Sequence, residues 1–349
     1  MTKIVIIETE YKNSDDRTYN AASKPYLDAV AILTRIGARK VLIKNRQKKN
    51  SSLLRKVLNR FDISFQALFK LFFIKNKYVF IQYPYVHDIA FRFGRFLKFN
   101  NNKIIVLVHD LESLRYATND NKLKYLLSVP DAIIAHTSNM ADWIRDKGYK
   151  GIINDLNLFD YLYTENNQEN SIYTTNNQIV VFAGNLHKSK FLTQLHKLHN
   201  TTTIKFHLWG IHNPEITCTE NIKYCGKFKS DDFSYVHGQW GLVWDGDDIY
   251  TCSGDLGNYL RYICPYKLCF YLAANLPVIV WKESAMAKFV KDNNIGICIN
   301  SLEDIQSEVS SITKEIYDEM KKSVSIKSEE IKQGHYLHAA LLKCISDLS

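Results

Sequence analysis

The sequence lacks any long hydrophobic run. Its most apolar region, residues 64–80, is interrupted by Lys70, Lys75 and Lys77, so no stretch reaches the roughly 18 uninterrupted apolar residues that a membrane span needs. The opening MTKIVIIETE turns acidic after a short apolar run, which predicts a buried strand rather than a signal peptide or a membrane anchor. We therefore expect a cytoplasmic globular protein. Peripheral association with the inner face of the cell membrane is compatible with this expectation.

Cysteine is absent from the first half of the chain, and no C-x-x-C pair occurs. All seven cysteines follow residue 217 and their number is odd, which is typical of reduced thiols and predicts neither a disulfide framework nor a zinc site. Motifs for nucleotide chemistry are missing too. Neither the P-loop pattern G-x-x-x-x-G-K-[ST] nor a G-x-G-x-x-G after a strand is present, which argues against ATP hydrolysis and dinucleotide redox chemistry.

Acidic residues are scarce between residues 39 and 103, where only Asp62 and Asp88 oppose many lysines and arginines, so the formal net charge of +9 is concentrated there. Aromatic residues such as Phe61 and Phe65 are interleaved with these cations. That mixture favours anionic lipid headgroups or a lipid-linked substrate over nucleic acid, for which no helix-turn-helix, RNP or zinc-finger signature is found. A merely solvated basic face is the simpler alternative.

Short β-branched apolar runs alternate with amphipathic stretches along the chain. Runs typical of buried strands are residues 3–8, 40–43, 78–83, 103–109, 131–137, 179–185, 204–210, 240–245, 277–281 and 296–299. Continuous apolar strands separated by helices are typical of parallel sheets covered on both faces. The polar, Asn-rich residues 163–178 predict a linker. We therefore predict two doubly wound, Rossmann-like α/β domains, residues 1–162 and 179–326, whose strand carboxyl ends line a cleft.

The first strand of the second domain ends in AGNLHKSKF, residues 183–191. Gly184 permits close backbone approach, Asn185 offers amide donors, and Lys188 adds charge. A helix following this turn would direct its first N–H groups towards an anion. A tight turn with an ordinary helix cap explains the same residues equally simply.

A second candidate lies in NYLRYICPYKLCFYLAANLPVIVW, residues 258–281. Pro265 suits the start of a helix that Asn275 and Pro277 end. Tyr266 and Lys267 then lie in its first turn, where backbone donors and an ammonium group suit a diphosphate. A solvated lysine is the alternative, but a cation at a helix amino terminus opposes the dipole, which favours an anionic ligand.

These segments, together with VHDLESLR, AHTSNMADWIRDKGY and NLFDYL, resemble bacterial glycosyltransferases of the GT-B fold. More narrowly, they resemble the family of β-1,6-galactofuranosyltransferases of surface-polysaccharide synthesis and of adhesin-glycosylating glucosyltransferases. The resemblance implies an enzyme that moves a hexose, galactofuranose or glucose, from a UDP-sugar to a growing glycan, which in some pathways is lipid-linked. It also implies self-association, and a carboxy-terminal helix, residues 327–349, that packs back on the first domain.

The resemblance assigns the donor site to the second domain. Its members are Gly184, Asn185, Lys188, Asp245, Tyr266, Lys267 and Ser284. Within this set, Lys267 is expected on the diphosphate, and Ser284 is expected to reach the ribose or a phosphate.

GT-B enzymes stabilise the departing diphosphate with cations and helix dipoles, so the resemblance implies neither a metal nor another cofactor. The acidic run Asp245, Asp247, Asp248 keeps a metal site open as an alternative.

A base must deprotonate the acceptor hydroxyl, and VHDLE offers Asp110 and His109 at the end of a strand. A structural histidine and a helix-capping aspartate are the alternatives. Glu112, Asp16 and Asn20 are acceptor-side candidates from their positions. Two other functions remain open: a noncatalytic subunit that binds a nucleotide sugar or glycan, and a peripheral membrane scaffold that uses residues 39–103.

Overall fold

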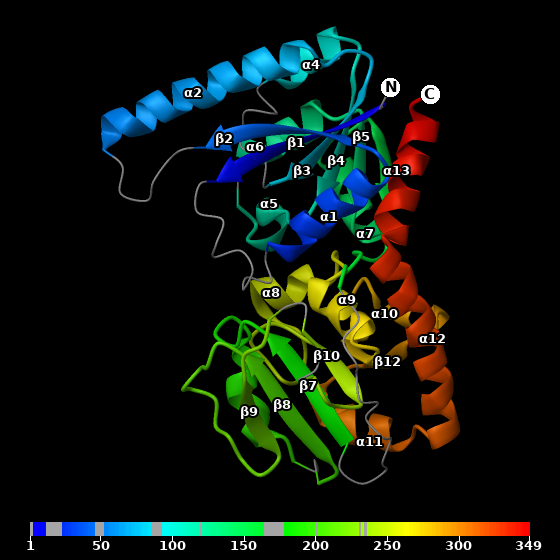
Figure 1. Ribbon diagram of the computed structural model, residues 1–349. Helices are drawn as coiled ribbons and strands as arrows, with labels where there is room; N and C mark the ends of the chain where they lie inside the picture. The colour runs from blue at the N-terminus through cyan, green and yellow to red at the C-terminus, as the bar shows by residue number, and fades with distance from the viewer. Residues whose placement is uncertain are drawn as a thin grey trace. The chain divides into compact units, whose positions relative to one another are not determined.

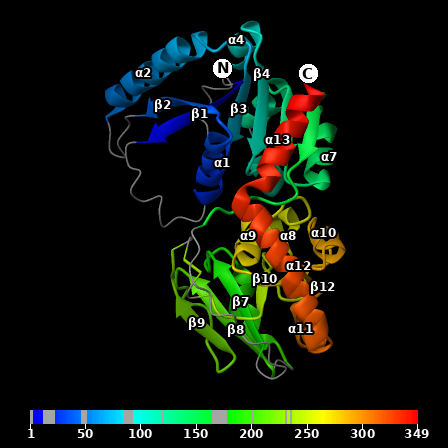
Figure 2. The same cartoon turned by 45° about the vertical axis from the view of Figure 1, so that its right-hand side comes forward.

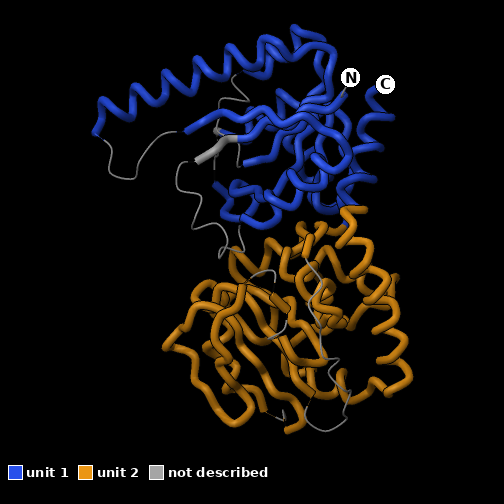
Figure 3. Tube along the Cα trace, in the orientation of Figure 1, with its two compact units in different colours: residues 1–157, 336–349 blue, residues 158–335 orange. Residues whose placement is uncertain are grey.

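The computed structural model describes residues 3–11, 23–45, 52–84, 93–118, 121–163, 178–199, 202–229, 232–233 and 236–349. The chain forms two compact units, residues 1–157 with 336–349, and residues 158–335 (Figure 3). Residues 158–162, which the sequence grouped with the first domain, thus lie in the second unit. The acceptor-side candidates Asp16 and Asn20 and most of the expected linker lie outside the described residues.

The first unit is built on a six-stranded parallel sheet in the order β2-β1-β3-β4-β5-β6 (Figure 1). Its strands are β1 (Ile4–Tyr11), β2 (Arg39–Asn45), β3 (Tyr78–Tyr83), β4 (Lys103–Val108), β5 (Ala132–Ala135) and β6 (Ile152–Asp155). Its helices are α1 (Lys24–Arg35), α2 (Leu53–Phe72), α4 (Gly94–Phe99), α5 (Glu112–Arg115), α6 (Asn121–Ser128), α7 (Ser138–Asp146) and most of α13 (His335–Asp347). The chain order reverses between β1 and β3.

The second unit has a six-stranded parallel sheet in the order β12-β11-β10-β7-β8-β9. Its strands are β7 (Gln178–Gly184), β8 (Ile204–Gly210), β9 (Ile222–Gly226), β10 (Trp240–Val243), β11 (Val278–Trp281) and β12 (Gly296–Ile299). Its helices are η2 (Lys190–Lys197), α8 (Gly254–Tyr259), α9 (Tyr266–Ala273), α10 (Ala287–Asp292), η3 (Leu302–Asp304), α11 (Ile305–Ser310) and α12 (Lys314–Gln333). The chain order reverses between β7 and β10, where ligands of such sheets bind.

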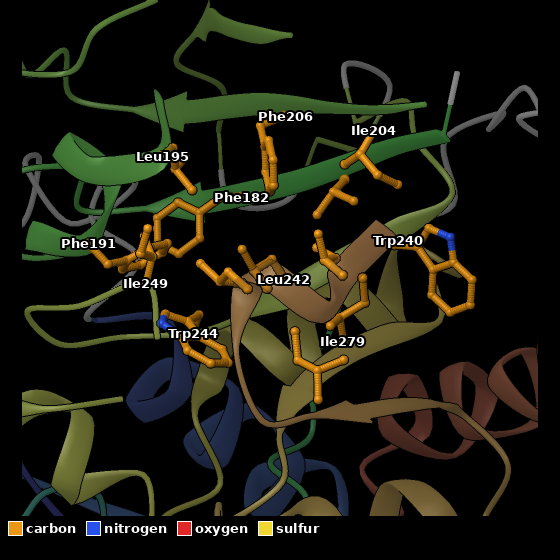
Figure 4. Close-up of a cluster of buried hydrophobic side chains, with 14 of the residues drawn as sticks. Phe182, Phe191, Leu195, Ile204, Phe206, Trp240, Leu242, Trp244, Ile249 and Ile279 are labelled. Carbon is orange, nitrogen blue, oxygen red and sulfur yellow. The ribbon is translucent and has the colours of Figure 1, made fainter. Parts of the chain in front are cut away.

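A buried aromatic and aliphatic cluster holds the central strands of the second unit together (Figure 4). Phe182 of β7 meets Phe191 of η2 edge to face, with ring centroids 5.4 Å apart. Leu242 of β10 and Ile279 of β11 belong to the same fully buried cluster. Burying one such side chain stabilises a fold by about 1.5–3 kcal/mol, so this cluster fixes where β7 and β10 end.

The carboxy-terminal segment consists of two helices separated by Gly334, whose φ of +83° ends α12 in the left-handed conformation. Helix α13 then returns to the first unit (Figure 2), where Asn154 Nδ2 donates to Asp347 Oδ2 at 3.0 Å. The segment that joins the first unit therefore begins at residue 336, not at residue 327 as the sequence suggested.

Candidate functional site

Helix α9 approaches strand β10 closely because Gly241 has no side chain. A Cβ atom at Gly241 would lie 2.2 Å from Cγ of Tyr271, far inside contact distance. The Tyr271 hydroxyl also accepts a hydrogen bond from the backbone N–H of Ala183 on β7, at 2.8 Å. Because Tyr271 touches both strands, it docks α9 against the two central strands at which the chain order reverses.

The helix expected after Pro265 is confirmed. Pro265 is the N-cap of α9, the helix ends at Ala273, and Asn275 adopts a left-handed φ of 54° just beyond it. Lys267 therefore lies in the first turn, as the sequence predicted.

Lys267 reaches the carboxyl end of β10. Its Nζ lies 3.2 Å from the carbonyl oxygen of Trp244, 3.5 Å from Oδ2 of Asp245, and 4.3 Å from the ring centroid of Phe182. The other carboxylate oxygen of Asp245 accepts a hydrogen bond from Ser189 Oγ at 3.1 Å. The sequence favours an anionic ligand for Lys267, and the structure adds an internal partner, Asp245, that also balances its charge.

The Gly184–Asn185 turn differs from the expected anion site. The Asn185 side chain accepts a hydrogen bond from the His187 N–H at 3.1 Å, and Lys188 is exposed. The next helix, η2, begins only at Lys190 and is a 3₁₀ helix, so no α-helical amino terminus follows the turn directly. Asn185 thus caps its own turn, and Gly184 and Lys188 border the end of β7.

The acidic run after β10 does not converge on one point. Asp245 faces Lys267, whereas Asp247 pairs with Lys190 at 3.1 Å, and Asp248 accepts from the Tyr250 N–H at 2.8 Å. Within the described ranges, no group of three or more His, Cys, Asp or Glu side chains is arranged to hold a metal ion. Each of these carboxylates has a protein partner of its own.

Tyr266 and Ser284 occupy different surroundings. The Tyr266 ring stacks on Tyr161, with centroids 4.9 Å apart, so it is held in an aromatic cluster. Ser284 follows β11, the strand next to β10, and is buried; among the residues that the structure describes, its Oγ has no hydrogen-bond partner. An unsatisfied buried hydroxyl costs about 1–3 kcal/mol, which a ligand oxygen would relieve.

In the first unit, His109 follows β4 and is packed tightly. Gln82 Nε2 donates to the Tyr26 carbonyl, which leaves Gln82 Oε1 to accept from His109 Nε2 at 2.7 Å. The His109 ring also stacks on Tyr26, with centroids 3.8 Å apart. Burial, with a smaller electrostatic contribution from the neighbouring His136, holds the pKa of His109 well below its usual value of 6.5. His109 is therefore held neutral in this arrangement, with its ring enclosed by Tyr26 and Gln82.

Asp110 is more accessible, with 40% of its side chain exposed, and pairs with Arg115 of α5. Glu112 is exposed in the first turn of the same short helix. Nearby, His136 lies against the Val108 carbonyl at 3.0 Å, and burial lowers the pKa of His136 to about 4. Three residues of this region, His136, Arg115 and Gln82, are not among the candidates that the sequence predicts. Arg115 and His136 lie within the segments VHDLESLR and AHTSNMADWIRDKGY that carry the family resemblance, whereas Gln82 lies in a strand and had no such signal.

Comparisons with known proteins identify the family. Residues 4–158 match the glucosyltransferase 3-like N-terminal domain, and residues 180–344 match the glucosyltransferase 3-like C-terminal domain. The chain belongs to the glucosyltransferase 3-like family of glycosyltransferases. The β-1,6-galactofuranosyltransferase WbbI of Escherichia coli (strain K12) is 33% identical over 270 residues, 76% of this chain and 77% of that protein. Glucosyltransferase 3 of Streptococcus gordonii is 24% identical over 260 residues, 72% and 73% of the two chains.

Solved structures agree on the fold. A putative UDP-N-acetylglucosamine 2-epimerase from Listeria monocytogenes aligns with a TM-score of 0.55 at 10% identity, over 100% of this chain and 98% of that one. A mutant of T4 phage BGT in complex with UDP-glucose aligns with a TM-score of 0.51 at 11% identity, over 99% of both chains. The predicted GT-B fold, with two Rossmann-like parallel sheets, is confirmed, and family membership makes the chain a glycosyltransferase.

Proposed function

We propose that the protein transfers a hexose from a UDP-sugar to a growing glycan of a bacterial surface polysaccharide or glycoprotein. The names of the two relatives, a galactofuranosyltransferase and a glucosyltransferase, support galactofuranose or glucose as the sugar. The observation that carries the proposal is the position of Lys267, in the first turn of α9 and at the ends of β7 and β10. In sheets of this kind, nucleotides bind at the point where the chain order reverses.

In this proposal, the diphosphate of the donor lies against Lys267 and the amino terminus of α9. Lys267 shares its charge between Asp245 and the incoming phosphate, and the helix dipole adds further positive potential. The negative charge on the diphosphate grows as the bond to the sugar breaks, so a fixed ammonium favours the transition state over the bound substrate. Ser284 offers its buried hydroxyl to the ribose or to a phosphate, and Gly184, Asn185 and Lys188 border the same side of the donor.

We propose that this leaving-group chemistry proceeds without a metal or another cofactor. The support is the arrangement of the acidic run, in which Asp245, Asp247 and Asp248 face Lys267, Lys190 and a backbone N–H rather than one another. A magnesium site would need several of these oxygens to turn towards a single point.

For the acceptor, we propose Asp110 as the general base. Its carboxylate is accessible at the end of β4, and Arg115 holds it in place. His109 is the weaker candidate because its ring is buried between Tyr26 and Gln82. We propose that Glu112, in the first turn of α5, binds the acceptor glycan beside this base. Asp16 and Asn20 stay acceptor-side predictions from the sequence.

Calorimetric titration with UDP, GDP, ADP and TDP, first without metal and then with magnesium, tests the donor assignment. We expect UDP to bind selectively, with the same affinity in both conditions. Transfer from UDP-galactofuranose and from UDP-glucose to glycan acceptors then identifies the sugar. Failure of every nucleotide to bind would contradict the UDP-sugar proposal, and binding that requires magnesium would contradict its metal-independent part.

A further inference from the structure

Helix α2 packs one narrow face on the protein through Ile63, Ala67 and Leu71, and two amides of the helix contact strand β2. The side-chain amide of Gln66 makes two hydrogen bonds to the backbone of edge strand β2. Its Oε1 accepts from the Lys44 N–H at 3.0 Å, and its Nε2 donates to the Lys44 carbonyl at 3.1 Å. About two turns earlier, Asn59 Nδ2 donates to Asn45 Oδ1 at 2.9 Å. These contacts cover an otherwise open sheet edge, and they fix which face of α2 points inward.

The opposite face of α2 is apolar and exposed. Its residues recur every three or four positions, as one face of a helix requires, and are Leu54, Leu58, Phe61, Phe65, Leu68 and Phe72. Phe61 and Phe65 are each 71% exposed. Helix α4 adds Phe99, also exposed, and α2 lies along the outer edge of the first sheet beside β2 (Figures 1 and 2). An ordinary surface helix is apolar only towards the protein, whereas α2 also has an apolar face towards solvent, so this outer face needs a partner.

The charges around this face have one sign. Arg55, Lys56 and Arg60 are exposed on α2, and Lys75 follows it. The only acidic residue of α2 is Asp62, which accepts a hydrogen bond from Gln66 Nε2 at 2.9 Å. A partner must therefore offer apolar surface and negative charge together.

We propose that the outer face of α2 docks the protein on an anionic lipid bilayer, with the helix lying in the headgroup region. No helix in the described part of the chain is long and apolar enough to cross a membrane, so the contact is interfacial. The aromatic face enters the acyl boundary while the flanking cations meet anionic headgroups.

A second copy of this chain is the competing partner. In a two-fold symmetric contact between two α2 faces, the same surface patch is used twice, so the interface holds the basic side chains of both helices and only Asp62 from each as an acidic partner on α2. Such a contact buries the phenylalanines but leaves like charges close together, whereas an anionic bilayer satisfies both features.

Co-sedimentation with vesicles tests the proposal. We expect the protein to bind vesicles of 30% phosphatidylglycerol in phosphatidylcholine. Its affinity for vesicles of pure phosphatidylcholine should be at least tenfold lower. The double variant Phe61→Ser/Phe65→Ser and the charge variant Arg55→Glu/Lys56→Glu/Arg60→Glu should each reduce binding at least tenfold. Leu342→Ser, which removes an exposed leucine from α13 of the same unit, is the matched control and should leave vesicle binding unchanged.

The altered side chains are exposed, so the variants should keep the circular dichroism, the melting temperature and the UDP affinity of the parent protein. The UDP measurement also keeps this proposal separate from the donor site. Vesicle binding that persists in both folded variants would overturn the proposal. A second result would also overturn it. If the protein did not bind vesicles, and if sedimentation velocity showed an oligomer that dissociates when Phe61 and Phe65 are replaced, a second copy would be the partner.

Discussion

Replacing Lys267 with alanine should weaken the binding of UDP about 30- to 150-fold. Two unit charges about 4 Å apart interact by about 4 kcal/mol at an effective dielectric constant of about 20, and by about 1 kcal/mol in bulk water. The Lys267 side chain is 17% exposed, which places it between these limits. We therefore expect a loss of about 2–3 kcal/mol of binding free energy, which corresponds to that range of affinities.

The Asp245 carboxylate makes this prediction sharper. It lies 3.5 Å from the Lys267 ammonium and would repel a diphosphate held at the same place. Asp245→Asn should therefore tighten UDP binding by about 1 kcal/mol, roughly fivefold. Added to Lys267→Ala, it should restore a similar part of the binding free energy that the lysine variant loses. Asp245 keeps its hydrogen bond from Ser189 in the single lysine variant, so the local fold should persist.

Isothermal titration calorimetry at low and at high salt measures these affinities, with circular dichroism as a check on folding. Lys288→Ala is the matched control, because this lysine of the same unit pairs with Asp292 on α10 and is highly exposed. High salt should reduce the difference in UDP affinity between the parent protein and Lys267→Ala, because ions screen the attraction between the Lys267 ammonium and the diphosphate. A Lys267→Ala protein that binds UDP within threefold of the parent would refute the placement of the diphosphate.

Three further predictions concern the base, the buried hydroxyl and a buried amine. Asp110→Asn should lower kcat at least a hundredfold while the Kd for UDP stays unchanged; unaltered turnover would exclude Asp110 as the base and would leave a noncatalytic role for this carboxylate. Ser284→Ala should raise the melting temperature slightly, because it removes an unsatisfied hydroxyl, and should weaken UDP binding several-fold; calorimetry and thermal melts would separate these two effects. Burial lowers the pKa of Lys321 from 10.5 to about 8, so its protonation opposes folding at neutral pH and this cost disappears as the pH rises from about 8 to 10.5. Lys321→Met should therefore stabilise the second unit by up to about 3 kcal/mol at pH 7 and by much less near pH 10.5, and equal denaturant midpoints for the two proteins at pH 7 would contradict this.

The sequence predicted most of the fold because both sheets are largely buried. Strands such as residues 103–108 and 278–281 are continuous apolar runs, and the structure places them at the expected positions. The strands that escaped prediction, β6 and β9, lie at the outer edges of the two sheets, where side chains are only partly buried and the apolar pattern is weaker. The edge strands β2 and β12 are also only partly buried, but each has a short apolar run, at residues 41–43 and 297–299, that made it predictable.

The site was harder to predict because its contacts are long-range. The sequence placed Lys267 in a first turn correctly, but the Asp245 carboxylate that meets it comes from another strand end, 22 residues earlier. Likewise, only the fold shows that His109 is enclosed by Tyr26 and Gln82, which takes it out of contact with solvent. A residue's chemical type is visible in a sequence, whereas the partner that sets its charge state is visible only in the fold.

On the proposed function, the pairing of Lys267 with Asp245 suits an enzyme that must release its product. An isolated, partly buried ammonium would be costly in the empty site and would hold the departing UDP too tightly. Asp245 offsets the first cost, and it competes with the diphosphate for the same ammonium once transfer is complete. The backbone contact from Lys267 to the Trp244 carbonyl keeps the amine in place through this exchange. The carboxylate next to the cation therefore limits the affinity for the diphosphate without removing the charge that stabilises its departure.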